Sequence, residues 1–346
     1  MSSDRDPVEA AASESRDLHG IATWEPRSAF DRVVSALYAL LHVLARVGTV
    51  ALSLSILASI GGVAAVADPQ TAALALLSAV PAVGLAAYVW YTDVTTEPLH
   101  LLVGTFLLGA ASAGFAAEIN SGLQPYLAGY GALSSVLYYF LVVGPGEESV
   151  KLLAVRLLPY GSERFSTVLD GAVYGAMAGM GFAFIENAIY IRRSLAVPEL
   201  EFGLSLLATG SAITATRAIA GPGHVIYSAF AGYYLGLAKF NPENRGPLVL
   251  KGILIAAALH GFYNATIGLG SSVVGAVTGL SGLGAFLVYV LLFDGIWGAV
   301  LFRKVERYRA AYNAADAGGA GTDDGNDQSA DAAARSEFEF GTNDGE

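Results

Sequence analysis

One short stretch of the chain places charged side chains where the surrounding sequence is apolar. Residues 144–151 read Gly-Pro-Gly-Glu-Glu-Ser-Val-Lys and lie between two apolar runs. A charge at membrane depth costs about 2.5–3.5 kcal/mol unless it is paired or faces a wet cavity. The Gly-Pro-Gly sequence predicts a helix break that sets Glu147 and Glu148 in the next helical turn, where free N–H groups favour an anion. A carboxylate held there is suited to general-base chemistry, and the alternative is a structural ion pair with Lys151.

Three more polar side chains interrupt apolar sequence: Glu186, His224 and His260. Glycines recur every four residues before Glu186, and such a small-residue face lets a neighbouring helix approach, so Glu186 is expected to point into the bundle. His224 follows a second Gly-Pro-Gly sequence, which is expected to break the helix in the same way, and His260 shares a helix face with Asn264. One carboxylate and two imidazoles form a set that binds catalytic zinc and leaves a position open for water. The alternative for an embedded histidine is a hydrogen-bonded core residue.

The other candidate side chains are expected to play smaller parts. Asp170 lies near the start of the helix that carries Glu186, and we predict that it acts at the helix N-terminus. Asp294 has three open interpretations: a partner for Lys151 or Arg217, an acid that supports the catalytic groups, or part of an ion path. The remaining histidines fall in a tail or at interfaces, and they are His19, His42 and His100.

The composition of the 346-residue chain restricts the class of protein. The sequence is 54% hydrophobic and 14% charged, which is typical of a polytopic membrane protein and predicts an all-α membrane helix bundle. The absence of cysteine excludes disulfides and thiolate chemistry. A net charge of −11 excludes a generic nucleic-acid-binding surface, so no nucleic-acid partner is expected.

The apolar runs predict about eight transmembrane helices and a possible re-entrant helix. Segment 204–219 is short for a span and rich in serine and threonine, so we expect it to be re-entrant, with a ninth span as the alternative. The fourth run is too long for a straight span, which agrees with a break at its Gly-Pro-Gly sequence. The expected spans are 47–67, 71–90, 99–117, 132–158, 166–191, 222–239, 248–269 and 281–302.

The distribution of charge predicts how the chain is organised around the membrane. Residues 1–46 are expected to form a cytoplasmic tail with an interfacial helix at 30–46, and residues 311–346 a disordered acidic tail. The transmembrane domain is predicted at 47–310. Of the 19 lysines and arginines, fifteen fall on one side of these spans, Lys151 is embedded, and three fall on the other side: Arg192, Arg193 and Arg217. Both termini of this multi-pass protein of the cell membrane are therefore expected to be cytoplasmic.

The embedded residues, taken in order, resemble one family. Residues 147–151 match EExxK, residues 182–186 match FxxxE, and two membrane histidines follow. This order resembles the PrsW family of intramembrane metalloproteases, part of the superfamily that includes the CAAX prenyl-protein proteases. The resemblance covers roughly residues 130–270. Residues 260–264 also look like the HxxxN motif of the CAAX branch, but the glutamate at position 186 places the chain nearer to PrsW.

The resemblance implies a peptidase that cuts in or near the transmembrane segment of a membrane protein, such as an anti-sigma factor. Glu147 is then expected to be the general base, with Glu148 and Lys151 setting its field and orientation. Asn264 would donate a hydrogen bond to the oxyanion. The expected zinc ligands are Glu186, His224 and His260. Related branches activate water with glutamate and histidine alone, so a site without metal is the alternative.

Two other functions fit embedded glutamate, histidine and lysine: a proton- or ion-coupled transporter, and an inactive scaffold with the same frame. The absence of a clear inverted repeat argues against transport. Hydrolysis is favoured if four side chains converge around one cavity: Glu147, Glu186, His224 and His260. Transport is favoured if the same four side chains lie along a continuous path across the bilayer. Their distances from the external helix ends, at about 1.5 Å per residue, predict a site in the outer half of the bilayer. Such a site would cut near the external juxtamembrane segment of its substrate.

Overall fold

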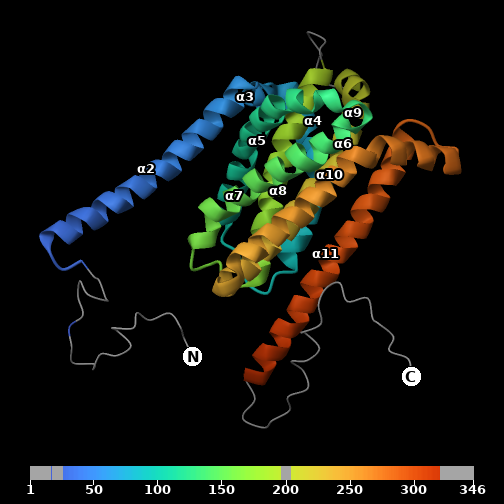
Figure 1. The fold of residues 1–346 in the computed structure, drawn as a ribbon. Coiled ribbons are helices and arrows are strands. Elements are labelled where there is room, and N and C mark those ends of the chain that lie inside the picture. Colours follow the sequence, from blue (N-terminus) through green and yellow to red (C-terminus); the bar gives the residue numbers. More distant parts are fainter. Residues whose placement is uncertain (1–16, 18–25, 196–203, 320–346) are drawn as a thin grey trace. The chain divides into compact units, whose positions relative to one another are not determined.

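The computed structural model describes residues 17, 26–195 and 204–319, and these residues form helices and no strands (Figure 1). The predicted all-α class is therefore confirmed for the described part of the chain. Chain contacts divide the protein into two units, residues 1–52 and 53–346. The first unit contributes residues 29–52 of helix α2 (Ala29–Ser59), which joins the predicted interfacial helix and the start of the first predicted span in one element.

The second unit carries every candidate site residue. Three 3₁₀ segments, η1 (Ala128–Leu133), η3 (Pro159–Gly161) and η4 (Pro242–Asn244), and one π-helical segment, η2 (Tyr139–Val143), connect its helices. The α-helices are α3 (Gly62–Ala67), α4 (Pro69–Tyr91), α5 (Leu99–Leu127), α6 (Ser134–Tyr138), α7 (Gly144–Leu157), α8 (Val168–Ser194), α9 (Leu204–Phe240), α10 (Arg245–Thr278) and α11 (Leu283–Gly319).

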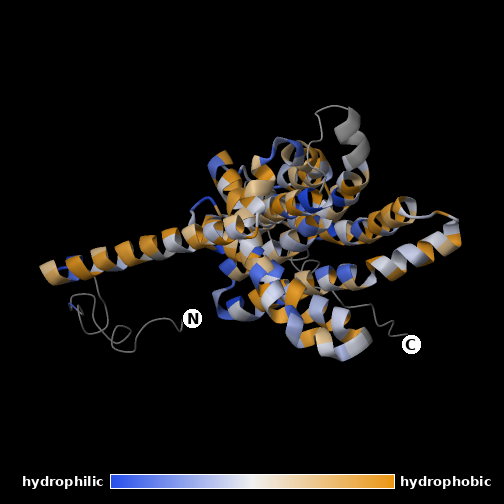
Figure 2. Cartoon of the chain, turned by 90° about the horizontal axis from the view of Figure 1, so that it is seen from above, coloured by the Kyte–Doolittle hydropathy of each residue, from blue (hydrophilic) through white to orange (hydrophobic). Residues whose placement is uncertain are grey.

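Five helical segments among the described residues are long and apolar enough to cross a membrane, so the chain is a membrane helix bundle. Large apolar side chains are exposed along these segments, and lipid is the solvent that suits such surfaces. Figure 2 shows hydrophobic residues along much of the length of the helices. The predicted count of about eight spans is not confirmed by the described residues. The five segments are Pro69–Tyr91, Leu99–Gly131, Val168–Ser194, Pro242–Thr278 and Leu283–Ala314.

The predicted helix breaks at the two Gly-Pro-Gly sequences are wrong. The backbone remains helical from Ser134 to Leu157, and the π-helical turn η2 precedes Gly144, so Pro145 falls in the first turn of α7. A π turn widens the helix locally and so accommodates a proline that cannot donate to the ladder. In α9 the helix continues through Pro222, and segment 204–219 is its first half rather than a separate re-entrant helix.

Helix α8 forms the buried centre of the bundle, and its glycines explain why. A Cβ atom at Gly171, Gly175 or Gly179 would overlap the carbonyl oxygens of Gly232, Ser228 and His224 on α9. The two backbones therefore pack closely along the predicted small-residue face. This contact brings the turn of α9 that carries His224 against the part of α8 that leads to Glu186.

The ends of the chain lie partly outside the described residues. Helix α11 continues to Gly319, so the first residues of the predicted acidic tail are helical. Residues 320–346 of that tail and most of residues 1–28, including His19, fall outside the described ranges.

Candidate active site

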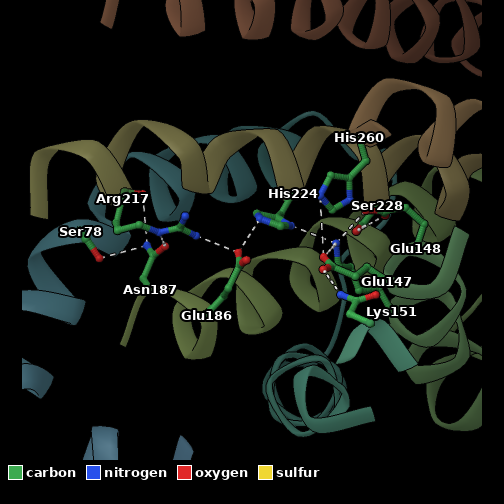
Figure 3. Close-up of polar contacts among 11 residues, drawn as sticks. Ser78, Glu147, Glu148, Lys151, Glu186, Asn187, Arg217, His224, Ser228 and His260 are labelled. Carbon is green, nitrogen blue, oxygen red and sulfur yellow. Dashed lines mark hydrogen bonds and ion pairs between the residues drawn. The ribbon is translucent and has the colours of Figure 1, made fainter. Parts of the chain in front are cut away.

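Four helices bring the main predicted residues to one place. Glu147 from α7, Glu186 from α8, His224 from α9 and His260 from α10 line a single cavity of about 580 Å³, and Asn264 lines it as well. Figure 3 shows the first four side chains close together. The side chains come from positions as far apart as 113 residues in the sequence, so only the helix packing joins them. This convergence is the arrangement that favours hydrolysis over a path across the bilayer.

The innermost part of the site is a fully buried ion pair. Lys151 Nζ lies 2.7 Å from Glu148 Oε1, and neither side chain is exposed. Ser228 Oγ donates to Glu148 Oε2 at 3.1 Å, and the ammonium also lies 4.2 Å from the centre of the Phe182 ring. A buried pair is tolerated when further hydrogen bonds satisfy its remaining lone pairs and protons, as they do here.

This ion pair determines which ring nitrogen of each histidine carries the proton, and the result differs between His224 and His260. Lys151 Nζ lies 2.9 Å from His224 Nδ1, and because the ammonium only donates, this nitrogen accepts. His224 Nε2 then carries the proton and donates to Glu186 Oε2 at 2.9 Å. His260 Nδ1 donates to Glu148 Oε1 at 2.9 Å, which leaves the lone pair of its Nε2 facing the cavity.

Glu147 has one anchored and one free oxygen. Asn120 Nδ2 of α5 donates to Oε1 at 3.0 Å. Oε2 is buried and has no hydrogen-bond partner among the described residues. Its nearest polar groups are Lys151 Nζ at 3.7 Å and His260 Nε2 at 3.8 Å. A buried carboxylate oxygen without a partner is costly, so this atom marks the position where a water or a metal ion is needed.

Glu186 is held from the opposite side. Its Oε2 accepts from Arg217 Nη2 of α9 at 2.8 Å as well as from His224. Polar contacts thus run without interruption from Arg217 through Glu186, His224 and Lys151 to Glu148 and His260, as Figure 3 shows.

Comparison with known proteins identifies the family. Residues 97–296, more than half of the chain, match the family model described as PrsW family intramembrane metalloprotease. The chain belongs to the PrsW family. It is 29% identical to the protease PrsW of Oceanobacillus iheyensis over 201 residues, which are 55% of this chain and 82% of that protein. It is also 31% identical to the protease PrsW of Geobacillus kaustophilus over 187 residues, which are 53% and 75% of the two chains. No solved structure shows a significant match.

Membership of the PrsW family makes the chain a membrane-embedded peptidase. The transporter interpretation is not favoured, because the family match covers the helices that carry the cavity and the cavity brings the four residues together. The predicted resemblance, made on four short motifs, is confirmed.

The PrsW family name implies a metal, and the residues present fit one. The ligand atoms of Glu147, His224 and His260 all lie within 4.8 Å of one another, and all three side chains are buried. One carboxylate and two imidazoles suit a catalytic zinc ion, and the unpartnered Glu147 Oε2 is an available ligand. Glu186, the carboxylate expected in this set, lies instead between His224 and Arg217.

Several residues of this PrsW site were not identified from the sequence. From the sequence, Arg217 was interpreted as an external charge, and no role was predicted for Asn120 or Ser228. Ser228 follows His224 by four residues and so shares its helix face, a signal that could have been used. Asn120 and Arg217 gave no such signal, because their contacts depend on how α5, α8 and α9 cross.

The remaining predictions have mixed outcomes. Asp170 forms a capping box with Thr167 at the start of α8, so its predicted helix N-terminal role is confirmed. Lys151 and Arg217 pair with other residues, and Asp294 Oδ1 is buried without a hydrogen-bond partner in the described part of the chain. Asp294 is therefore not shown to be a partner of either cation. His100 lies in the exposed first turn of α5, away from the cavity residues.

Proposed function

We propose that the chain is an intramembrane endopeptidase that hydrolyses a peptide bond in or near the transmembrane segment of a membrane protein, with Glu147 as the base that activates water. One observation carries this proposal: Glu147 Oε2 is the unpartnered carboxylate oxygen of a cavity that also presents two histidines and Asn264.

The geometry supports a role for each side chain in the proposed reaction. Asn120 holds Glu147 Oε1, so Oε2 is left to take a proton from a water in the cavity as the oxygen adds to the peptide carbonyl carbon. The same carboxyl group then gives the proton to the departing nitrogen when the carbon–nitrogen bond breaks. Asn264 is a donor that can stabilise the negative charge on the carbonyl oxygen. Glu148 and Lys151 hold the histidines and do not reach the substrate.

Zinc is the proposed metal, held by His224 and His260 together with a carboxylate. A bound zinc ion would polarise the peptide carbonyl and make the water more acidic. Because Glu147 is assigned the role of base, Glu186 is the proposed third ligand, and its Oε2 lies 2.9 Å from His224 Nε2. Glu147, whose ligand atom lies within 4.8 Å of those of both histidines, stays free to act on water. Binding at His224 Nε2 requires its proton to leave, so zinc binding should release protons.

The proposed substrate is a single-span membrane protein, anti-sigma-factor-like by family resemblance, that is cut near its external side. The cavity is lined by Ile189, Tyr190 and Arg193 as well as Glu186, so it extends toward the C-terminal end of α8. If both termini are cytoplasmic, as the charge distribution predicts, this end of α8 faces outward. The site would then lie in the outer half of the membrane.

The test is cleavage by the purified protein in nanodiscs, with a panel of single-span substrates, with and without chelator. We expect cleavage by the wild-type protein and none by Glu147→Gln, and we expect the new termini to lie in the outer part of the substrate span. A cut on the cytoplasmic side would contradict the proposed orientation alone. No cleavage of any substrate by zinc-loaded protein would contradict the peptidase mechanism.

A further inference from the structure

The Arg217 side chain makes three separate contacts with neighbouring residues. Its Nη2 contacts Glu186 Oε2 at 2.8 Å, its Nε donates to Asn187 Oδ1 at 2.8 Å, and its guanidinium carbon lies 4.5 Å from the centre of the Tyr190 ring. Asn187 in turn donates to Ser78 Oγ at 3.0 Å and to the carbonyl oxygen of Arg217 at 3.2 Å. Asn187 and Ser78 are both buried.

These contacts form one unit, which we call the arginine clamp: Ser78, Glu186, Asn187, Tyr190 and Arg217. It joins α4, α8 and α9 beside the cavity, and Figure 3 shows the line from Ser78 through Asn187 and Arg217 to Glu186. A planar guanidinium can contact a carboxylate, an amide oxygen and an aromatic ring at the same time, whereas a lysine ammonium offers no such fork.

With the clamp in place, the three carboxylates of the site differ in how close their nearest cation lies. Glu148 has Lys151 at 2.7 Å, and Glu186 has Arg217 at 2.8 Å. Glu147 has its nearest cation only at 3.7 Å. Two of the three carboxylates are thus neutralised by close partners, and Glu147 is the one left available for a proton or a metal ion.

We propose that Arg217 is a positioning residue: through the clamp it fixes the Glu186 carboxylate on His224 Nε2, and so keeps Glu186 out of the place where Glu147 acts. This inference rests on the proposed function, because it assigns Arg217 a part in the same reaction. Without the guanidinium, Glu186 would be an uncompensated second carboxylate next to His224. It could then turn into the cavity and compete with Glu147.

The test compares four variants in nanodiscs with a substrate that the wild-type protein cleaves. Arg217→Met removes the charge and keeps the apolar stem, Arg217→Lys keeps the charge without the fork, and Asn187→Ser loosens the clamp without touching Glu186. Arg192→Met is the matched control, because Arg192 is an arginine on α8, the helix of Glu186 and Asn187, and donates to the Ala64 carbonyl oxygen outside the cavity.

A positioning role predicts a fall in kcat with KM nearly unchanged. Misplacing a catalytic group by about 1 Å can cost about 100-fold, so we expect a loss of that order for Arg217→Met. Arg217→Lys and Asn187→Ser should show smaller losses, and Arg192→Met should equal the wild type. Histidine ¹⁵N spectra of the metal-free protein should show the protonated Nε2 of His224 in the wild type and an altered signal in Arg217→Met, with His224→Gln used for assignment.

Three results would overturn the inference. A raised KM with unchanged kcat in Arg217→Met would make Arg217 a substrate contact. Wild-type kcat in that variant would show that the clamp is dispensable. An equal loss of melting temperature and of correctly inserted protein, with normal kcat per folded molecule, would make the clamp purely structural. Because every variant is compared with an active wild type, each result is distinct from a failure of the peptidase proposal.

Discussion

Helix α8 carries an acidic group near each end, and the two groups differ in what surrounds the carboxylates. Near the C-terminal end, Glu186 belongs to a group with two histidines, a lysine and an arginine around a cavity. Near the N-terminal end, Asp170 lies with Asp93 and Glu97 from the connection between α4 and α5. The ligand atoms of these three lie within 4.8 Å of one another, as do those of Glu147, His224 and His260 beside Glu186. By spacing alone, both groups could hold a metal ion.

The partners separate the two groups. Asp170 accepts from the backbone N–H of Ser166 and Thr167 and from the hydroxyls of Thr95 and Thr167. Glu97 accepts from the Tyr174 hydroxyl. These donors serve to cap α8 and fasten it to the preceding connection, and the group contributes no histidine. The comparison teaches that catalytic character here comes from imidazoles, compensating cations and an unpartnered oxygen at a cavity, and not from a cluster of carboxylates.

The largest effect that tests this contrast is the loss of a catalytic side chain. Glu147→Gln, Glu186→Gln and His260→Ala should each reduce the cleavage rate by roughly 10⁴-fold or more, because each removes a member of one catalytic unit. Single-turnover cleavage measures the effect, and circular dichroism checks the fold. His100→Ala is the control and should be nearly silent. Near-full activity in any of the three variants would remove that residue from the unit.

A second prediction distinguishes the two carboxylates around the histidines. Chelation should abolish cleavage and zinc should restore it, and titration with zinc alone should show weaker binding in both Glu147→Gln and Glu186→Gln. Loss of a group that only supports the metal site typically costs 10–100-fold in metal affinity, so we expect about that for Glu147→Gln and a larger loss for the ligand variant Glu186→Gln. The reverse order would make Glu147 the third ligand and would remove it as the base.

The sequence predicted the polar half of this site better than its surroundings. The four-residue spacing of the glycines before Glu186 predicted the face of α8 that packs on α9, because helix periodicity alone determines which residues share a face. Embedded charges predicted a cavity, since a charge without partners is too costly in lipid. Both inferences depend only on local geometry or on solvation, which the sequence encodes directly.

The errors concern properties that depend on neighbouring helices. Both Gly-Pro-Gly sequences were expected to break the helix, yet the backbone stays helical through a π turn before Gly144 and through Pro222. Arg217 read as an external charge because its position along the chain does not show that it lies beside Asn187 and Tyr190. Such contacts depend on how the helices cross, and the local sequence pattern does not predict these crossings.

A third prediction concerns the acidic group at the N-terminal end of α8. Burial, with the nearby Asp170 charge, raises the pKa of Asp93 to about 7, and burial raises the pKa of Glu97 to about 7 despite the hydrogen bond from Tyr174. In the unfolded chain both carboxyls titrate near pH 4. The folded state therefore holds protons that the unfolded state has lost, and stability should fall as pH rises from about 4 to about 7.

Thermal unfolding in micelles between pH 4 and 8 tests this effect. Asp93→Asn should flatten the pH dependence and raise the melting temperature above that of the wild type at pH 8, while the two proteins stay close at pH 4. The cleavage rate of the variant at pH 8 should match the wild type, since Asp93 does not line the cavity. A loss of cleavage in well-folded Asp93→Asn would mean that the two ends of α8 are functionally coupled.

The smallest predicted effect comes from the capping box that begins α8. The Thr167 hydroxyl accepts from the Asp170 N–H, and the Asp170 carboxylate accepts from the Thr167 N–H. Thr167→Val keeps the shape and removes the hydroxyl, so it should lower the free energy of unfolding by about 1 kcal/mol, the usual cost of a lost N-cap. Thr167→Ser keeps the hydroxyl and should cost clearly less. Unfolding of the two variants under identical conditions measures the difference, and kcat should stay at the wild-type value in both. Since Thr167 and Glu186 lie at opposite ends of one helix, a kcat that falls with the cap would show that the start of α8 helps to set the catalytic geometry. An unchanged kcat would confirm that the carboxylate group there serves the fold alone.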